Sequence, residues 1–137
     1  MIVVLDTNIY ISGTFWLGIS KRIIRKAKER GFVVVVSEEM LDELKDVLTR
    51  KDKDFKLSNE EAGKIIKDIT SYAKIVKPSQ KVTVCRDKKD NMVIECAIAG
   101  RARYIISGDY DLKALGKYNE IEMIDAYRFL EILEGAR

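Results

Sequence analysis

The chain contains no histidine, one proline and two cysteines among its 137 residues. The absence of histidine excludes Ser-His-Asp and Cys-His catalysis, as well as zinc bound by histidine. Any hydrolytic reaction would therefore depend on carboxylates, lysine, tyrosine, serine or a metal ion. Cys85 and Cys96 form no CxxC pair, and we expect both to remain thiols in a reducing compartment.

The sequence also lacks the segments that direct a protein into or across a membrane. Apolar residues never continue for the roughly 20 positions that a membrane-spanning helix needs, and the first residues show no signal-peptide pattern. A cytoplasmic protein without a membrane partner is therefore expected. The GxxxxGK[ST] pattern of a phosphate-binding loop is missing too, which argues against an NTPase.

The pattern that is present predicts a parallel-sheet α/β fold. Short β-branched runs alternate with amphipathic stretches, and the length fits one domain over residues 1–137. Strands are predicted at Ile2 to Leu5, Phe32 to Val36, Lys74 to Val76, Val82 to Val84, Tyr104 to Ser107 and Ile121 to Ile124. Helices are predicted at Ile19 to Arg30 and at Asp111 to Leu115. Four more are predicted to follow caps: from Ser37 to about Thr49, from Ser58 to about Ala73, from Asp87 to about Arg101, and after Asp125. A loop is predicted from Arg50 to Leu57.

Two acidic residues stand where predicted strands end. Asp6 follows the first strand, and Asp109 follows the strand that ends at Ser107-Gly108. Ligands bind at the carboxyl ends of the strands in an open α/β sheet. Carboxylates gathered there repel one another unless a cation joins them, and ligands that are all oxygen suit Mg²⁺ or Mn²⁺.

Two further acids are placed near the strand ends by predicted helices. Glu43 lies at the border of the apolar stripe of its helix, where it can reach a cleft while the helix stays packed. Asp90 lies in the first turn of a helix predicted to be largely buried, and Asp87 is the better cap of that helix. Structural alternatives remain: a surface ion pair for Glu43, a helix-dipole interaction for Asp90 and a turn cap for Asp6.

Polar residues adjoin the strand-end acids. Thr7, Asn8 and Ser107 could orient the carboxylates or hold a metal-bound water, and turn formation is the alternative. Asp111 is expected to cap the short helix that follows it, which leaves Asp109 without a structural role.

Glu95 is the one charged residue inside the apolar middle of its predicted helix. We expect it to have a structural role in an ion pair with Arg101, Arg103 or a lysine of a loop.

Together these segments resemble the PIN-domain family. The matching segments are Leu5 to Asn8, Ser37 to Leu44, Asp87 to Asn91 continuing to Ala97, and Tyr104 to Asp109. Their order and spacing are similar to the family pattern over nearly the whole chain. The resemblance implies a three-layer α/β/α fold with a central parallel sheet. It also implies a Mg²⁺- or Mn²⁺-dependent endoribonuclease that hydrolyses single-stranded RNA.

The resemblance also implies roles for individual residues. The catalytic and metal-binding set would be Asp6, Glu43, Asp90 and Asp109, and the supporting residues would be Asn8, Ser107 and Asp111. Asn91 departs from the family pattern, because many relatives carry a second acid there, and a second metal site is expected to be weaker.

Partners follow from the same resemblance. The chain is similar to archaeal and bacterial PIN proteins that are toxins of toxin–antitoxin systems, which implies a cognate antitoxin protein and a homodimer. Phe15, Trp16 and Tyr72 could serve an interface or the core. The basic clusters Lys21 to Arg30 and Arg86 to Lys89 are predicted to contact the RNA backbone, unless they only solvate helix faces.

Two other functions compete with a nuclease. A PIN fold could bind RNA or a protein without cutting, although the presence of all four acids argues mildly against this. A receiver-type signalling domain needs a pair of acids near the first strand, where this chain offers only Asp6. A metal-dependent nuclease remains the favoured interpretation.

Overall fold

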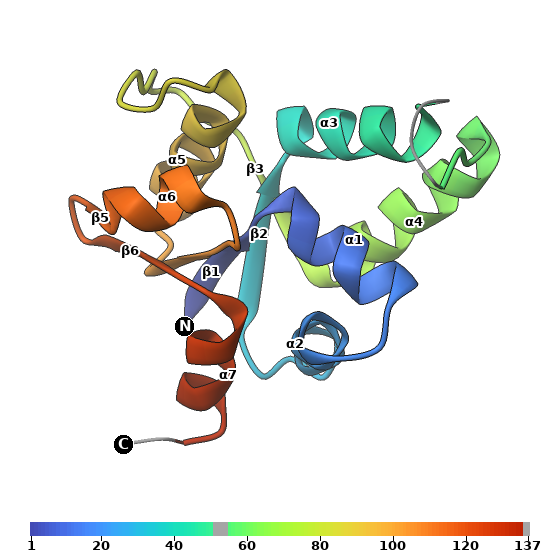
Figure 1. Cartoon of the computed structure of the whole chain (residues 1–137), viewed down its shortest axis with the longest axis horizontal. Helices are drawn as coiled ribbons and strands as arrows, with labels where there is room; N and C mark the ends of the chain where they lie inside the picture. The colour runs from blue at the N-terminus through green and yellow to red at the C-terminus, as the bar shows by residue number, and fades with distance from the viewer. Residues whose placement is uncertain (51–54, 136–137) are drawn as a thin grey trace.

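The computed structural model describes residues 1–50 and 55–135, and it consists of a sheet with helices on both faces (Figure 1). The strands are β1 (Ile2–Leu5), β2 (Val33–Ser37), β3 (Ala73–Val76), β4 (Tyr104–Ile106), β5 (Lys117–Tyr118) and β6 (Ile121–Ile124). The helices are α1 (Thr7–Phe15), α2 (Ile19–Lys28), α3 (Glu38–Thr49), α4 (Asn59–Tyr72), α5 (Lys88–Gly100), α6 (Tyr110–Leu115) and α7 (Ala126–Leu133).

The strand order places a topological switch point at the centre of the sheet. The order is β3-β2-β1-β4-β6-β5, and every neighbouring pair is parallel except β5 with β6. In Figure 1, α5 and α6 lie on one side of the sheet and α1, α2 and α4 on the other. The predicted three-layer fold is confirmed, with one antiparallel strand added at an edge. Because the chain winds from β1 toward β3 and then returns to β4, the switch point lies between β1 and β4.

The two central strands form the most buried part of the core. Val4 and Leu5 of β1 and Ile105 and Ile106 of β4 are fully buried. Continuous apolar runs are what parallel strands covered on both faces require. The buried centre fixes the positions of the residues that follow each strand, Asp6 and Ser107.

Four predicted helix caps are confirmed. Ser37, Asp87 and Asp125 each accept a hydrogen bond from a backbone N–H of the helix that follows, and Ser58 forms a complete capping box with Glu61. Capping satisfies N–H groups that a helix leaves without an internal partner. These local signals therefore place the starts of α3, α4, α5 and α7 correctly.

Two further features of the structure differ from the sequence-based predictions. Helix α1 was not predicted, because its apolar residues do not gather on a single face; Ile9, Tyr10 and Ile11 are consecutive and all buried. The strand predicted at Val82 to Val84 is wrong, since this β-branched segment forms no strand. The Val82 amide instead donates a hydrogen bond to Oε2 of Glu95 at 2.9 Å. Glu95 thus has the expected structural role, with a backbone partner in place of the predicted ion pair.

Other predictions concern surface segments. Phe15 and Trp16 are exposed, whereas Tyr72 belongs to the core. Residues 51–54 of the predicted loop lie outside the described part of the chain. Within the described residues, no helix is both long and apolar enough to cross a lipid bilayer.

Candidate functional site

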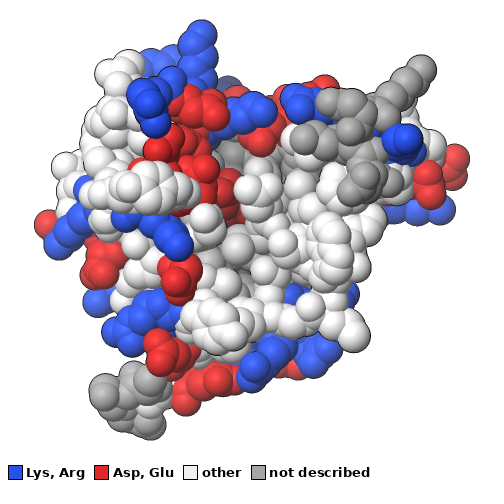
Figure 2. All heavy atoms as spheres, in the orientation of Figure 1, with Lys and Arg blue, Asp and Glu red and all other residues white. Residues whose placement is uncertain are grey.

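The four acids selected from the sequence line one cleft at the carboxyl ends of β1 and β4. The cleft has a volume of about 230 Å³, and its walls include Asp6, Glu43, Asp90 and Asp109. In Figure 2, acidic side chains gather around a recess at the centre of the visible face. Side chains far apart in the sequence therefore meet where an open α/β sheet binds its ligands.

Asp6 is held by hydrogen bonds to both of its carboxylate oxygens. Oδ1 accepts from the Thr7 amide at 2.8 Å, and Oδ2 accepts from the Ser107 hydroxyl at 2.7 Å. Burial raises the pKa of Asp6 above its ordinary value, the bonds from Ser107 and Thr7 oppose that rise, and Asp109 adds to it. Asp6 caps α1, which is the structural alternative considered for it, and the same carboxylate also lines the cleft.

Ser107 connects the two strand-end acids. Its hydroxyl donates to Asp6 and accepts a hydrogen bond from the Asp109 amide at 2.9 Å. The side chain is fully buried, so the hydroxyl has a fixed position. One buried group therefore sets the relative positions of Asp6 and Asp109.

Glu43 approaches the cleft from α3. The Thr7 hydroxyl donates to Oε1 of Glu43 at 3.3 Å, which links Glu43 to the segment that carries Asp6. Burial raises the pKa of Glu43, the ammonium of Lys89 lowers it, and the charge of Asp6 raises it. The predicted position of Glu43 at the edge of a buried helix face agrees with this arrangement.

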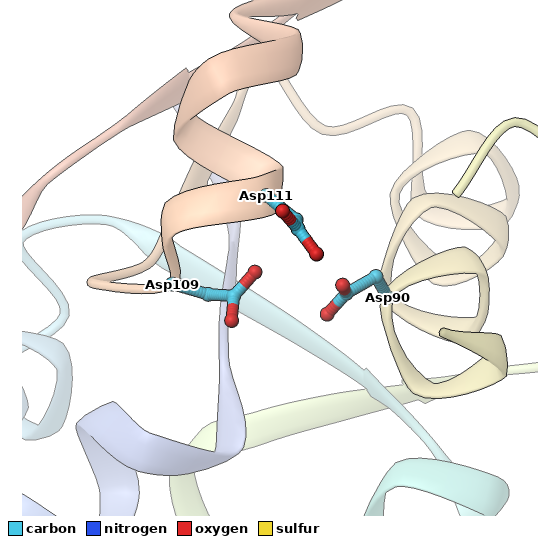
Figure 3. A group of neighbouring side chains, drawn as sticks. All are labelled: Asp90, Asp109 and Asp111. Carbon is cyan, nitrogen blue, oxygen red and sulfur yellow. The ribbon is translucent and has the colours of Figure 1, made fainter. Parts of the chain in front are cut away.

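Asp90, Asp109 and Asp111 form a closer group, which we call the acidic triad (Figure 3). One carboxylate oxygen from each lies within 4.8 Å of the others, and the three side chains point toward one another from α5, from α6 and from the loop just before α6. Burial, followed by the charges of Asp109, Asp87, Asp6 and Asp111, raises the pKa of Asp90 to about 6. The site therefore concentrates negative charge.

The roles of Asp109 and Asp111 differ from the prediction. The cap of helix α6 lies two residues earlier than expected: Asp109 is the cap and accepts from the Leu112 amide at 3.1 Å. The prediction that Asp111 caps this helix is wrong. Asp111 lies within the first turn and contributes its carboxylate to the acidic triad.

Cations border the cleft without neutralising its centre. Among the described residues, neither Asp90 nor Asp109 forms an ion pair, while Asp111 lies 3.4 Å from the exposed guanidinium of Arg86. Lys89 lines the cleft, whereas no residue of the Lys21 to Arg30 cluster does.

Arg50 is a cleft residue that the sequence analysis assigned to a loop. It lines the cleft together with Glu43 and Val47, and these three positions are spaced by four and three residues. That spacing places side chains on one face of a helix. The helical period of α3 was thus the signal that could have identified Arg50. Asn8 is exposed and also lines the cleft.

The donor set fits a hard divalent cation. The cleft offers carboxylate oxygens and no imidazole, and Mg²⁺ and Mn²⁺ prefer oxygen ligands. Burial is the largest cause of the raised pKa of Asp90, and the charges of the neighbouring carboxylates add to it, so a bound cation would relieve this second part. Asp90, Asp109 and Asp111, with Asp6 and Glu43 in the adjacent wall, are the residues that could hold the ion.

Comparison with known proteins gives matches to a family, to a relative and to solved structures. The sequence profile of a family described as PIN domain matches residues 2–111. An uncharacterized protein of Methanocaldococcus jannaschii is 32% identical over 120 residues, which cover 86% of this chain and 77% of the relative. The structure is also similar to a chain in the crystal structure of VapBC2 from Rickettsia felis bound to a DNA fragment from their promoter. That match has a TM-score of 0.60 and 16% identity over 91% of this chain and 98% of the other, and it concerns the fold alone.

Proposed function

The chain belongs to the PIN domain family, and on that premise we propose that it is a metal-dependent endoribonuclease that hydrolyses single-stranded RNA. Carboxylates from the end of β1, from α3, from α5 and from the cap of α6 face one cleft, and this convergence carries the proposal. The absence of histidine supports it, because the remaining route to hydrolysis at this site is through carboxylates and a cation.

The residues of the cleft have distinct tasks in this proposal. Asp6 and Asp90 would hold the ion together with Asp109 and Asp111, and Glu43 would contribute from α3. When bound, Mg²⁺ or Mn²⁺ would lower the pKa of a water molecule and offset charge on the phosphate oxygens.

The chain's own residues bind and orient the RNA. Lys89 and Arg50 line the cleft beside the carboxylates, and Arg86 extends into solvent next to Asp111. Cations in these positions can bind the phosphates on either side of the cleaved bond. Neither histidine nor attack by a ribose 2′-hydroxyl is needed, so the products should carry 5′-phosphate and 3′-hydroxyl ends.

A cleavage assay tests this proposal. A fluorescent single-stranded RNA should be cut in Mn²⁺ or Mg²⁺, remain intact in EDTA, and yield fragments with 5′-phosphate ends. Cleavage that continues undiminished in EDTA would exclude the metal. RNA that is bound but never cut would instead support a non-catalytic binding module.

Replacing Ser107 by alanine should lower the cleavage rate about 10- to 100-fold, the usual cost of losing a group that orients metal ligands. The physical reason is that the Ser107 hydroxyl bonds to both Asp6 and the Asp109 amide. Steady-state kinetics with varied Mn²⁺ would measure the loss. Ser71→Ala removes an exposed hydroxyl that bonds only locally, to the Asp68 carbonyl, and should leave the rate unchanged. An equal effect of the two variants would contradict the role of Ser107.

The same site would make the chain a toxin of a toxin–antitoxin pair. The fold likeness to a chain of VapBC2 supports a protein partner of this kind, and exposed Phe15, Trp16 and Leu17 provide apolar surface for an antitoxin or a second copy of the chain. Expression of the parent should arrest bacterial growth, whereas Asp6→Asn should not. Growth arrest by both, at equal protein levels, would show that toxicity does not come from the cleft.

A further inference from the structure

A second hollow adjoins the acidic triad. It has a volume of about 270 Å³ and lies between a loop and α6, and its walls are Val84, Cys85, Arg86, Asp111, Ala114 and Leu115. Asp111 belongs both to these walls and to the triad. A group seated in the hollow would therefore lie next to the carboxylates that are proposed to act on RNA.

The loop that forms one wall is held in place by two side chains of α5. The Asn91 side chain accepts from the Cys85 amide at 2.9 Å and donates to the Cys85 carbonyl at 3.0 Å. Glu95, one helical turn further on, accepts from the Val82 amide. An ionised aspartate at position 91 could not donate to the Cys85 carbonyl, so it is the amide of Asn91 that fixes this wall from both sides of the peptide.

The exposed groups around the hollow suit a flat, partly apolar ligand. Val84 is 49% exposed and Leu115 is 36% exposed, and apolar surface gathered in a hollow often marks a binding site. The Arg86 side chain is 89% exposed, so its guanidinium plane is accessible. Pockets for drug-sized ligands measure roughly 300–1,000 Å³, and this hollow is slightly smaller.

We propose that the hollow receives the nucleobase that flanks the cleaved phosphate, and that it gives the enzyme a preference for the base at that position. This inference rests on the proposed nuclease function. Single-stranded RNA is recognised through unstacked bases that lie against flat side chains, including arginine guanidinium planes, and that form hydrogen bonds with their edges. Val84 and Leu115 offer apolar contact, and Arg86, which lies 3.4 Å from Asp111, offers a plane and the donors that this contact leaves free.

A protein ligand fits the hollow less well. Stable protein interfaces bury about 800 Å² on each partner, whereas this hollow has room for one small group. The hollow shares Asp111 with the acidic triad, and a phosphate and its own base neighbour each other in every nucleotide. A base of the substrate is therefore the group that fits this hollow.

An abasic scan with the unaltered protein tests the proposal. A series of fluorescent RNAs with one cleavage site would carry a base-free ribose at each position in turn. Cleavage should fall about tenfold when the missing base is the one that flanks the cleaved bond, as expected for a lost base contact, and should change little at distant positions. A uniform response along the series would overturn the proposal.

A blocking variant adds a second measurement. Ala114 is exposed on α6, and Ala114→Trp would fill the hollow with a ring; it should slow cleavage of ordinary RNA about tenfold and abolish the difference between ordinary and abasic RNA. Thr70→Trp places the same ring at an exposed position of α4 outside the hollow and should keep that difference. Equal behaviour of the two variants would contradict a base site here.

Photo-crosslinking separates this inference from the proposed function, because it does not need cleavage. RNA containing 4-thiouridine, irradiated with the protein in EDTA, should crosslink to the peptide containing Val84 to Arg86 or to the one containing Ala114 and Leu115. Crosslinks confined to other peptides, with normal cleavage in Mn²⁺, would overturn the base site alone. Crosslinks in the hollow without any cleavage would support the site and contradict the nuclease.

Discussion

Asp90→Asn is expected to lower the rate of RNA cleavage about 1,000-fold or more, and at the same time to stabilise the metal-free protein above pH 7. The loss of activity follows from the position of Asp90 in the acidic triad, because removing a ligand forfeits charge stabilisation worth several kcal/mol. The gain in stability follows from the pKa of Asp90, which burial and the neighbouring acids raise from 3.8 to about 6. Its charged form is therefore disfavoured in the folded state, and asparagine removes that cost.

The expected gain is modest because the cleft is open to solvent. A pKa rise of about two units corresponds to nearly 3 kcal/mol, and screening by water should reduce the effect to about 1–2 kcal/mol. Urea denaturation in EDTA at pH 7.5 would measure the free energy of unfolding. Asp42→Asn is a suitable control, since Asp42 is exposed on α3 next to Glu43 and lines no part of the cleft.

A fall in the cleavage rate together with a rise in the free energy of unfolding distinguishes a site residue from a structural acid. Glu61 is a structural acid: the Ser58 amide donates a hydrogen bond to its carboxylate in the capping box, and this bond is the main cause of its lowered pKa. Removing such a charge destabilises the fold. If Asp90→Asn lost stability, or if it cut RNA at the parental rate, Asp90 would belong with Glu61 and the proposed metal site would fail.

The main strands and the acids at their ends could be predicted because the signals are local. A β-branched run such as Val33 to Val36 suits only a strand covered on both faces, and Asp6 follows β1 without a gap. Caps such as Ser58 are equally local. Tertiary structure was needed to show that the cleft unites Asp6, Glu43, Asp90 and Asp109, although the order of strand ends already indicated it.

The sequence-based predictions of secondary structure fail where tertiary contacts override local patterns. Helix α1 packs on more than one side, so Ile9 to Ile11 give no amphipathic signal. The run from Val82 to Val84 has strand-like residues, but Glu95 and Asn91 hold the loop by side-chain hydrogen bonds in place of a ladder. No local pattern encodes these bonds.

The cap of α6 lies two residues before the predicted one, and this displacement exchanges the roles of two acids. The expected cap Asp111 faces the triad, and Asp109 is both the cap and a wall of the cleft. A structural role and a site role are compatible because a carboxylate has two oxygens with several lone pairs. Asp6 also combines two roles, because its Oδ1 caps α1 and its Oδ2 accepts a hydrogen bond from Ser107.

Stabilisation of the protein by Mn²⁺ is expected to depend strongly on pH, growing between pH 5 and pH 7. A divalent cation binds the deprotonated carboxylate, and the pKa of Asp90 is raised to about 6, so protons compete with the ion below that value. The apparent dissociation constant should rise about tenfold for each pH unit below 6, and more steeply where Asp6 and Glu43, whose pKa values are also raised, take up protons as well.

The metal-free protein should show the opposite trend over the same range. Since the pKa of Asp90 is higher in the folded state than its ordinary value of 3.8, the folded state binds more protons between these values. The stability that this group contributes is complete below about pH 4 and is lost as the pH rises through about 6. Mn²⁺ at about 100 times its dissociation constant would add about 2.7 kcal/mol to the free energy of unfolding at neutral pH.

Thermal denaturation with and without Mn²⁺ from pH 5 to pH 8 would measure both trends without any RNA. The difference in Tm should be about half as large at pH 5 as it is above pH 7, and Asp90→Asn should remove most of this dependence on pH. Asp42→Asn should reproduce the parental curves. A Tm difference that is equal at pH 5 and pH 7.5 would mean that Mn²⁺ binds elsewhere on the protein, because only carboxylates with raised pKa values can make its binding titrate near pH 6 in a chain without histidine.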